Sequence, residues 1–171
     1  RVRECKVYCE VVPYTKAIET IKEKRPVGII FTGGPNSVYA TDAPAIDKSV
    51  YEAGIPILGI CYGAQLMAQD LGGKVERQEL QEFGKIEIEA NSGLIAKAVD
   101  KGVSWMSHVD QITEIPAGFV ATATSQQCPY AAIEAPDKKL YAVQFHPEVE
   151  HTPFGKEFLK SFLYDVCGCT G

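Results

Sequence analysis

The sequence predicts an α/β protein with a parallel sheet covered by helices on both faces, and three observations support this. Strand-length apolar segments alternate with helix-like segments through the first 71 residues. The segments 27–31 and 55–60 are apolar throughout, which is typical of strands that are buried on both faces. From residue 85 onward the pattern changes to short strands with turn residues between them.

The expected elements alternate in type along the first half of the chain. In order, they are a strand at 5–12, a polar-faced helix at 15–24, a strand at 27–32, a helix from about 44 to 53, a strand at 55–60 and a helix at 62–71. The turn Gly33-Gly34-Pro35 ends the second strand, and Gly72-Gly73 supplies a stop signal for the last helix. The second half is expected to contain strands at 85–90, 119–124, 130–135 and 140–145 and a closing helix from about 154 to 166.

Length, charge and hydropathy exclude several classes of protein. The 171 residues, of which 46% are hydrophobic, fit one globular domain at 1–171. We expect this domain to be a fragment of a longer chain, because the sequence lacks an initiator Met. The net charge of -5 argues against a nucleic-acid partner. The longest apolar segments are far shorter than the ~20 residues that a membrane-spanning helix requires.

Six cysteines in a chain of this length and hydrophobicity predict reduced thiols and a cytoplasmic protein rather than a disulfide framework. The tail pair Cys167 and Cys169 has no matching Cys or His pair, so no metal site is expected. These two, with Cys5, Cys9 and Cys128, are interpreted as small buried hydrophobes or incidental thiols.

Cys61 differs from the other cysteines because of its place in Gly59-Ile60-Cys61-Tyr62-Gly63, between an apolar strand and a helix. This is the cysteine form of a nucleophile elbow. Glycines two positions away on each side let the strand and the helix approach, and the turn exposes the central thiol. The N-terminus of the following helix favours the thiolate.

A general base for this nucleophile is expected in Gln144-Phe145-His146-Pro147-Glu148, where another apolar strand ends. Pro147 keeps the residue before it extended, so that His146 and Glu148 point the same way. Glu148 can then accept the Nδ1 proton of His146 and leave Nε2 facing the thiol. The sequence therefore predicts a triad of Cys61, His146 and Glu148.

Three motifs together resemble the class I glutamine amidotransferases over nearly all of the chain. They are Gly33-Gly34-Pro35, Gly59-Ile60-Cys61-Tyr62-Gly63-Ala64-Gln65 and Phe145-His146-Pro147-Glu148. The resemblance implies the flavodoxin-like fold of that family, with a central, mostly parallel sheet flanked by helices and a smaller antiparallel sheet. It also implies that the first βα unit of the family is missing, because the chain starts at Arg1-Val2-Arg3-Glu4, where members have the end of their first helix.

The resemblance implies an activity and a role for each site residue. Cys61 attacks the side-chain amide of glutamine, His146 acts as acid and base, and Glu148 orients it; a γ-glutamyl thioester forms, and ammonia and glutamate are released. The remaining roles concern binding: Gly34 and Tyr62 supply backbone N–H groups to the oxyanion hole, while Gln65, Ser107 and Asp110 contact the substrate. Polar-face or turn-capping roles are the alternatives for Gln65, Ser107 and Asp110. Val109 stands where bacterial members often have Gly.

Further segments resemble one subfamily, in which the ammonia aminates XMP to GMP. They are Trp105-Met106-Ser107-His108, Cys128-Pro129 and Val149-Glu150-His151-Thr152. In that subfamily an ATP- and Mg-dependent synthetase domain on the same chain receives the ammonia, the full enzyme is a homodimer, and the glutaminase domain itself needs no cofactor. The alternatives are a γ-glutamyl hydrolase and a non-enzymatic regulatory domain on the same fold.

Overall fold

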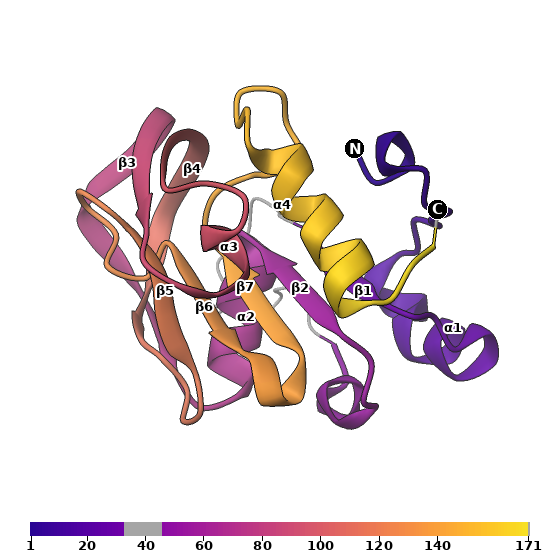
Figure 1. The fold of residues 1–171 in the computed structure, drawn as a ribbon. Helices are drawn as coiled ribbons and strands as arrows, with labels where there is room; N and C mark the ends of the chain where they lie inside the picture. The colour runs from indigo at the N-terminus through magenta and orange to yellow at the C-terminus, as the bar shows by residue number, and fades with distance from the viewer. Residues whose placement is uncertain (33–45, 171) are drawn as a thin grey trace.

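The computed structural model describes residues 1–32 and 46–170, and it confirms the predicted α/β class (Figure 1). Within these residues one mixed sheet has the strand order β1-β2-β7-β6-β5-β3-β4. The strands are β1 Ile29–Phe31, β2 Ile57–Ile60, β3 Lys74–Ala90, β4 Lys101–Glu114, β5 Val120–Ser125, β6 Ala132–Ala135 and β7 Leu140–Val143. The α-helices are α1 Ala17–Lys24, α2 Tyr62–Asp70, α3 Gly93–Ala96 and α4 Gly155–Ser161, the last continuing as a π-helical turn at Phe162–Val166.

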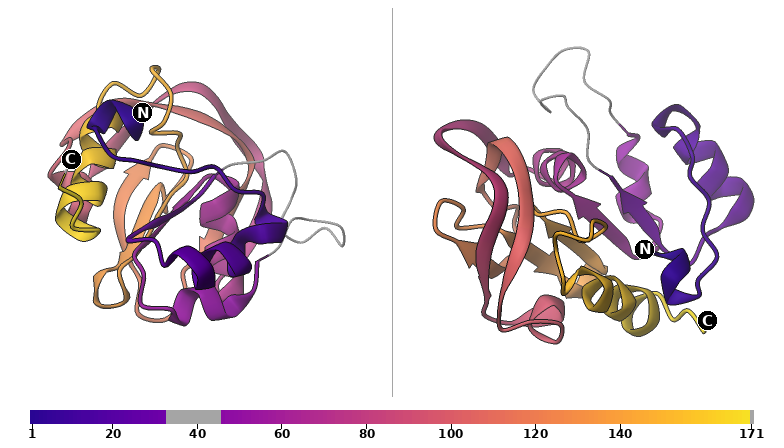
Figure 2. Two further views of the ribbon diagram at one scale, coloured as in Figure 1. Left: turned by 90° about the vertical axis from the view of Figure 1, so that its right-hand side faces the viewer. Right: turned by 90° about the horizontal axis from the view of Figure 1, so that it is seen from above.

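The sheet is parallel at one end and antiparallel at the other. Strands β1, β2 and β7 pair in parallel, whereas β7 to β6, β6 to β5, β5 to β3 and β3 to β4 are antiparallel. The antiparallel strands thus continue the parallel sheet. The β3–β4 pair forms a long curved arm at the end of this sheet (Figure 2).

Two apolar layers hold the helices against the parallel strands. Leu58 and Ile60 of β2 pack in one cluster with Phe158 of α4. Ile57, which points to the opposite face, packs in a second cluster with Met67 of α2 and Ile21 of α1. A strand whose neighbouring side chains are all buried in this way has no polar face, which explains the unbroken apolar segment in the sequence.

The expected strand at 5–12 is wrong. Arg3–Cys5 form a 3₁₀ turn, residues 7–13 have no regular secondary structure, and Tyr8 and Val11 are 82% and 95% exposed. A strand is stable only where a neighbouring strand takes up its backbone hydrogen-bonding groups. Among the described residues, β1 pairs with β2 alone.

Other predicted elements differ in extent. The helix expected at about 44–53 is a 3₁₀ helix at Lys48–Glu52 in its described part, and the turn Gly33-Gly34-Pro35 lies outside the described residues. The strand expected at 85–90 is the C-terminal part of the much longer β3. Strand β4 was not predicted, because its buried positions carry polar residues such as Ser104 and His108, which hide the apolar alternation. No helix within 1–32 or 46–170 is long and apolar enough to cross a membrane.

Candidate active site

Cys61 occupies the predicted elbow between β2 and α2. Its backbone has a φ of 52° and a ψ of -106°, a conformation that residues other than glycine seldom adopt. A Cβ atom on Gly59 would lie 2.7 Å from the Gly63 carbonyl oxygen, and a Cβ atom on Gly63 would clash with the Phe31 backbone. Both glycines are therefore required by the close contact of β2, α2 and β1, as the sequence predicted.

The strand order brings His146 to the nucleophile. Strand β7 lies beside β2, and the backbone N–H of Cys61 donates to the Val143 carbonyl at 2.9 Å. His146 follows β7 at the same edge, and its own N–H donates to the Trp105 carbonyl of β4 at 2.9 Å. The carboxyl ends of two parallel strands thus place the thiol and the imidazole together.

The electrostatics of the triad favour a charged imidazole. The Nδ1 atom of His146 lies 3.0 Å from Glu148 Oε2. A hydrogen bond with the Cys61 sulfur, together with the Glu148 carboxylate, raises the pKa of His146 to about 10, although burial acts in the opposite direction. Burial is the largest single influence and would raise the pKa of Glu148, but the hydrogen bond from His146, a backbone hydrogen bond and the nearby positive charges together lower it. These directions describe an imidazolium held between a sulfur and a carboxylate, as in a cysteine nucleophile paired with its base.

The structure also brings candidate substrate residues close to the nucleophile. The Cys61 thiol donates to the Ser107 carbonyl at 3.7 Å. Gln65, one turn into α2 and 4% exposed, donates from Nε2 to the Asp110 carbonyl at 3.0 Å. Tyr62 is the first residue of α2, so its backbone N–H directly follows the nucleophile. Gly34 lies outside the described residues.

Val109 sits between Ser107 and Asp110 within β4, and it is not among the described residues that have a positive φ. The backbone therefore accommodates a β-branched side chain at this position, where family members often have Gly.

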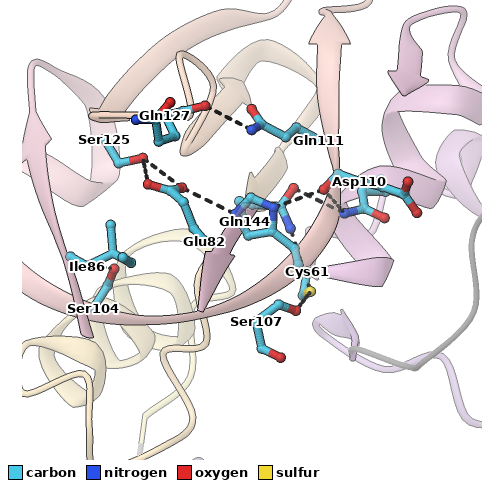
Figure 3. A network of polar contacts seen from close by, with 12 residues as sticks. Cys61, Glu82, Ile86, Ser104, Ser107, Asp110, Gln111, Ser125, Gln127 and Gln144 are labelled. Carbon is cyan, nitrogen blue, oxygen red and sulfur yellow. Dashed lines mark hydrogen bonds and ion pairs between the residues drawn. The ribbon is translucent and has the colours of Figure 1, made fainter. Parts of the chain in front are cut away.

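Gln144 is a site residue that the sequence did not single out. It is 1% exposed; its Nε2 donates to Cys61 Sγ at 3.6 Å, and its Oε1 accepts from Gln65 at 3.2 Å (Figure 3). Gln144 therefore links the nucleophile to the candidate substrate residues. The sequence predicts an extended segment here, but residues 144 and 145 form a bend and residues 147 and 148 a turn, so the period of a strand could not identify Gln144.

A second group that the sequence missed consists of Glu82, His108 and Cys128, all buried, with potential metal-ligating atoms within 4.8 Å of one another. Glu82 already accepts hydrogen bonds from Ser125 Oγ at 2.9 and 2.8 Å and lies 3.3 Å from His108 Nε2. The other ring nitrogen of His108 lies 3.0 Å from the Asp110 carbonyl. Burial raises the pKa of the Cys128 thiol to about 12. Glu82 and His108 are therefore part of a hydrogen-bonded network as it stands, and with Cys128 they form a group of described residues that could ligate a metal.

Comparison with known proteins places this geometry in a family. The model of glutamine amidotransferase class-I matches residues 1–166. The chain is 57% identical over 173 aligned residues to a protein of Clostridium botulinum named GMP synthase [glutamine-hydrolyzing], and 54% identical over 170 to one of that name from Clostridium perfringens. The matches cover 100% and 98% of this chain but only 34% and 33% of those relatives. The chain thus spans about a third of the length of the curated relatives it matches.

Solved structures agree with this assignment. A Thermoplasma acidophilum protein, described as one subunit of a GMP synthase, superposes with a TM-score of 0.81 at 30% identity, covering 98% of this chain and 84% of that one. A glutamine amidotransferase from Thermotoga maritima has the same fold, with a TM-score of 0.72 at 19% identity and coverage of 90% and 92%. The chain therefore belongs to the class I glutamine amidotransferase family.

Proposed function

We propose that this chain hydrolyses glutamine to glutamate and ammonia through a thioester on Cys61. The observation that carries the proposal is the triad, in which a cysteine in a strained elbow meets a histidine whose Nδ1 lies 3.0 Å from the Glu148 carboxylate. The Cys61 thiolate attacks the carboxamide carbon, and His146 protonates the departing nitrogen so that ammonia leaves. Water activated by His146 then cleaves the thioester and releases glutamate.

The oxyanion that forms during this attack needs hydrogen-bond donors. The backbone N–H groups of Tyr62 and Gly34 are proposed for this role, and the N-terminal end of α2 adds a favourable dipole. Gln65, Ser107 and Asp110 are proposed to hold the rest of the glutamine molecule. Their positions beside Cys61 support this assignment, since the Ser107 carbonyl contacts the thiol and Gln65 is bonded to the Asp110 carbonyl.

We further propose that the ammonia is used by a synthetase domain on the same chain, which aminates XMP to GMP with ATP and Mg. The curated relatives that carry the name GMP synthase [glutamine-hydrolyzing] are about three times as long as the part that this chain matches, which leaves room for such a domain. A direct transfer is needed because free ammonia becomes mostly unreactive ammonium at neutral pH. A homodimeric, cytoplasmic enzyme is part of the same proposal.

The test is Cys61→Ala in the full-length enzyme. We expect glutamine-dependent GMP formation to disappear while formation from added ammonium salt is retained, because the two half-reactions use different sites. Loss of both activities in a variant that keeps the circular dichroism spectrum of the wild type would contradict the proposal. Release of glutamate from γ-glutamyl peptides, without amination of XMP, would favour a hydrolase instead.

A further inference from the structure

Glu82 is a buried carboxylate that the proposed chemistry does not use. It is 2% exposed, whereas its neighbours Gln81 and Phe83 are exposed. Removing a carboxylate from water is costly unless hydrogen bonds and opposite charge compensate it. The burial of Glu82 therefore has to be explained, and the geometry of the surrounding backbone explains it.

An irregularity in the β3–β4 ladder directs Glu82 into the protein. Arg77 pairs with Asp110 and Glu82 pairs with His108, so residues 78–81 of β3 lie opposite the single residue Val109 of β4. Extra residues in one strand of a ladder bend it and re-aim the side chains that follow. Here the irregularity places Glu82 against His108, directly opposite the segment proposed to bind glutamine.

The hydrogen bonds around His108 have a defined direction. A carbonyl oxygen can only accept, so Nδ1 of His108 must carry the proton in its 3.0 Å contact with the Asp110 carbonyl. An ionised Glu82 can likewise only accept, at 3.3 Å from Nε2. Burial is the largest single influence and would raise the pKa of Glu82, but the interactions with His108 and the hydrogen bonds from Ser125 and the Gln127 backbone together lower it. Both ring nitrogens of His108 therefore face acceptors, and Glu82 holds the ring in the orientation in which Nδ1 faces the Asp110 carbonyl.

The Asp110 carbonyl joins this pair to the nucleophile. It accepts from Gln65 Nε2 at 3.0 Å as well as from His108, and Gln65 and Gln144 continue the network to Cys61 Sγ (Figure 3). The Gln65 bond ties this oxygen of β4 to α2, whereas the His108 bond lies within β4 and fixes the orientation of the carbonyl. Any displacement of His108 would move the wall of the pocket and not the thiol itself, which the elbow holds independently.

We propose that Glu82 is a positioning residue of the glutamine pocket, which acts through His108 on the Asp110 carbonyl and the β4 segment around it. This rests on the proposed glutaminase function. Loss of Glu82 should weaken glutamine binding while leaving the reactivity of Cys61 nearly unchanged. The Ser125 hydroxyl donates to both carboxylate oxygens of Glu82, so its loss should also weaken glutamine binding, but by less.

The first measurement is the glutaminase kinetics of the full-length protein. We expect Glu82→Leu to raise KM for glutamine by about tenfold or more with kcat changed by less than about threefold, which is the pattern of lost binding rather than lost chemistry. Glu82→Gln keeps an oxygen that can accept from His108 and Ser125, so it should restore most of the affinity. Glu87→Leu, the same change at an exposed position of β3, is the matched control and should behave as the wild type.

The second measurement separates this inference from the proposed function. We expect Glu82→Leu to slow the labelling of Cys61 by an electrophilic glutamine analogue and to leave its alkylation by iodoacetamide unchanged. If glutamine does not protect the wild-type Cys61 thiol from alkylation, the proposed function fails. If glutamine does protect it, but Glu82→Leu equals the wild type in KM and in the rate of labelling, the inference fails. Should Glu82→Leu not fold, Ser125→Ala decides by the same readouts. If the protein binds one equivalent of zinc and Cys128→Ser abolishes this binding, the cluster is a metal site and the positioning role of Glu82 is overturned.

Discussion

Replacement of Thr152 by Val should both destabilise the protein and slow the glutaminase reaction. Thr152 is fully buried, and its hydroxyl donates to the His146 carbonyl at 2.7 Å while accepting from the Trp105 N–H at 2.8 Å. Valine has nearly the same shape but can neither donate nor accept. The change therefore leaves two backbone groups, the His146 carbonyl and the Trp105 N–H, without these partners.

The magnitude follows from those two groups. Each buried group that loses its partner costs about 1–3 kcal/mol, so we expect the free energy of unfolding to fall by about 2–4 kcal/mol, allowing for some relaxation. The bond from His146 N–H to the Trp105 carbonyl remains and limits the movement. Since an error of ~1 Å in the position of a catalytic group can reduce the rate ~10²-fold, kcat should fall by between about 10- and 100-fold.

Urea unfolding and steady-state glutamate release measure the two effects. Thr152→Ser keeps the hydroxyl and should retain most of the stability and rate. The matched control is Thr113→Val, because the Thr113 hydroxyl bonds only an exposed carboxylate, that of Glu76, and its loss should change the free energy of unfolding by less than about 0.5 kcal/mol. If Thr152→Val and Thr113→Val give the same stability and kcat, the bridge does not hold His146 and the reasoning is refuted.

Three other predictions concern reactivity, pH and coupling. An electrophilic glutamine analogue should label Cys61 alone among the six cysteines, because Cys128 is buried with its pKa raised to about 12; peptide mapping that shows equal labelling of Cys128 would contradict this. The pKa of His146 is raised to about 10, so its contribution to stability is complete below pH ~6.5 and is lost as the pH rises through 10; urea unfolding should show a decline over this interval that His146→Gln lacks. Glutaminase turnover of the full enzyme should rise with ATP and XMP. His151→Ala, which removes a ring whose centre lies 4.6 Å from that of Trp105 at a tilt of 46°, should diminish that response; equal turnover in every condition would rule coupling out.

The parallel half of the fold and the approach of Cys61, His146 and Glu148 could be predicted because their signals lie within short segments of the sequence. The segment 55–60 is apolar since both faces of β2 are covered. The glycines at 59 and 63 are required by backbone contacts next to Cys61. His146 and Glu148 meet as expected, but through a turn at residues 147 and 148 and not through the extended chain that was predicted. Each of these signals is complete within a few residues.

The β3–β4 arm and its network could not be predicted in this way. Strand β4 buries Ser104, His108 and Asp110, so its inward face does not look apolar. The partners that make this burial possible are distant in sequence: Gln65 and the Asp110 carbonyl are separated by 45 residues, and Glu82 and Ser125 by 43. A polar residue at a buried position cannot be recognised until its partner is known.

The groups proposed for the chemistry and those proposed for glutamine binding lie in different parts of the sheet, which correspond to the parts with local and with distant sequence signals. The nucleophile and its base stand at the ends of β2 and β7, which lie side by side within the apolar core. The candidate substrate groups stand on β4, the last strand of the sheet, and β3 joins β4 to the rest through only three residue pairs with β5. Apolar residues of the arm such as Met106 and Ile112 pack in the core clusters, and polar links such as the Gln65 bond to Asp110 and the His146 bond to Trp105 add to these contacts. Changes in these links should alter how glutamine is held more than how the thiol reacts. Thr152 and Trp105 are exceptions, because both are hydrogen-bonded to the backbone of His146.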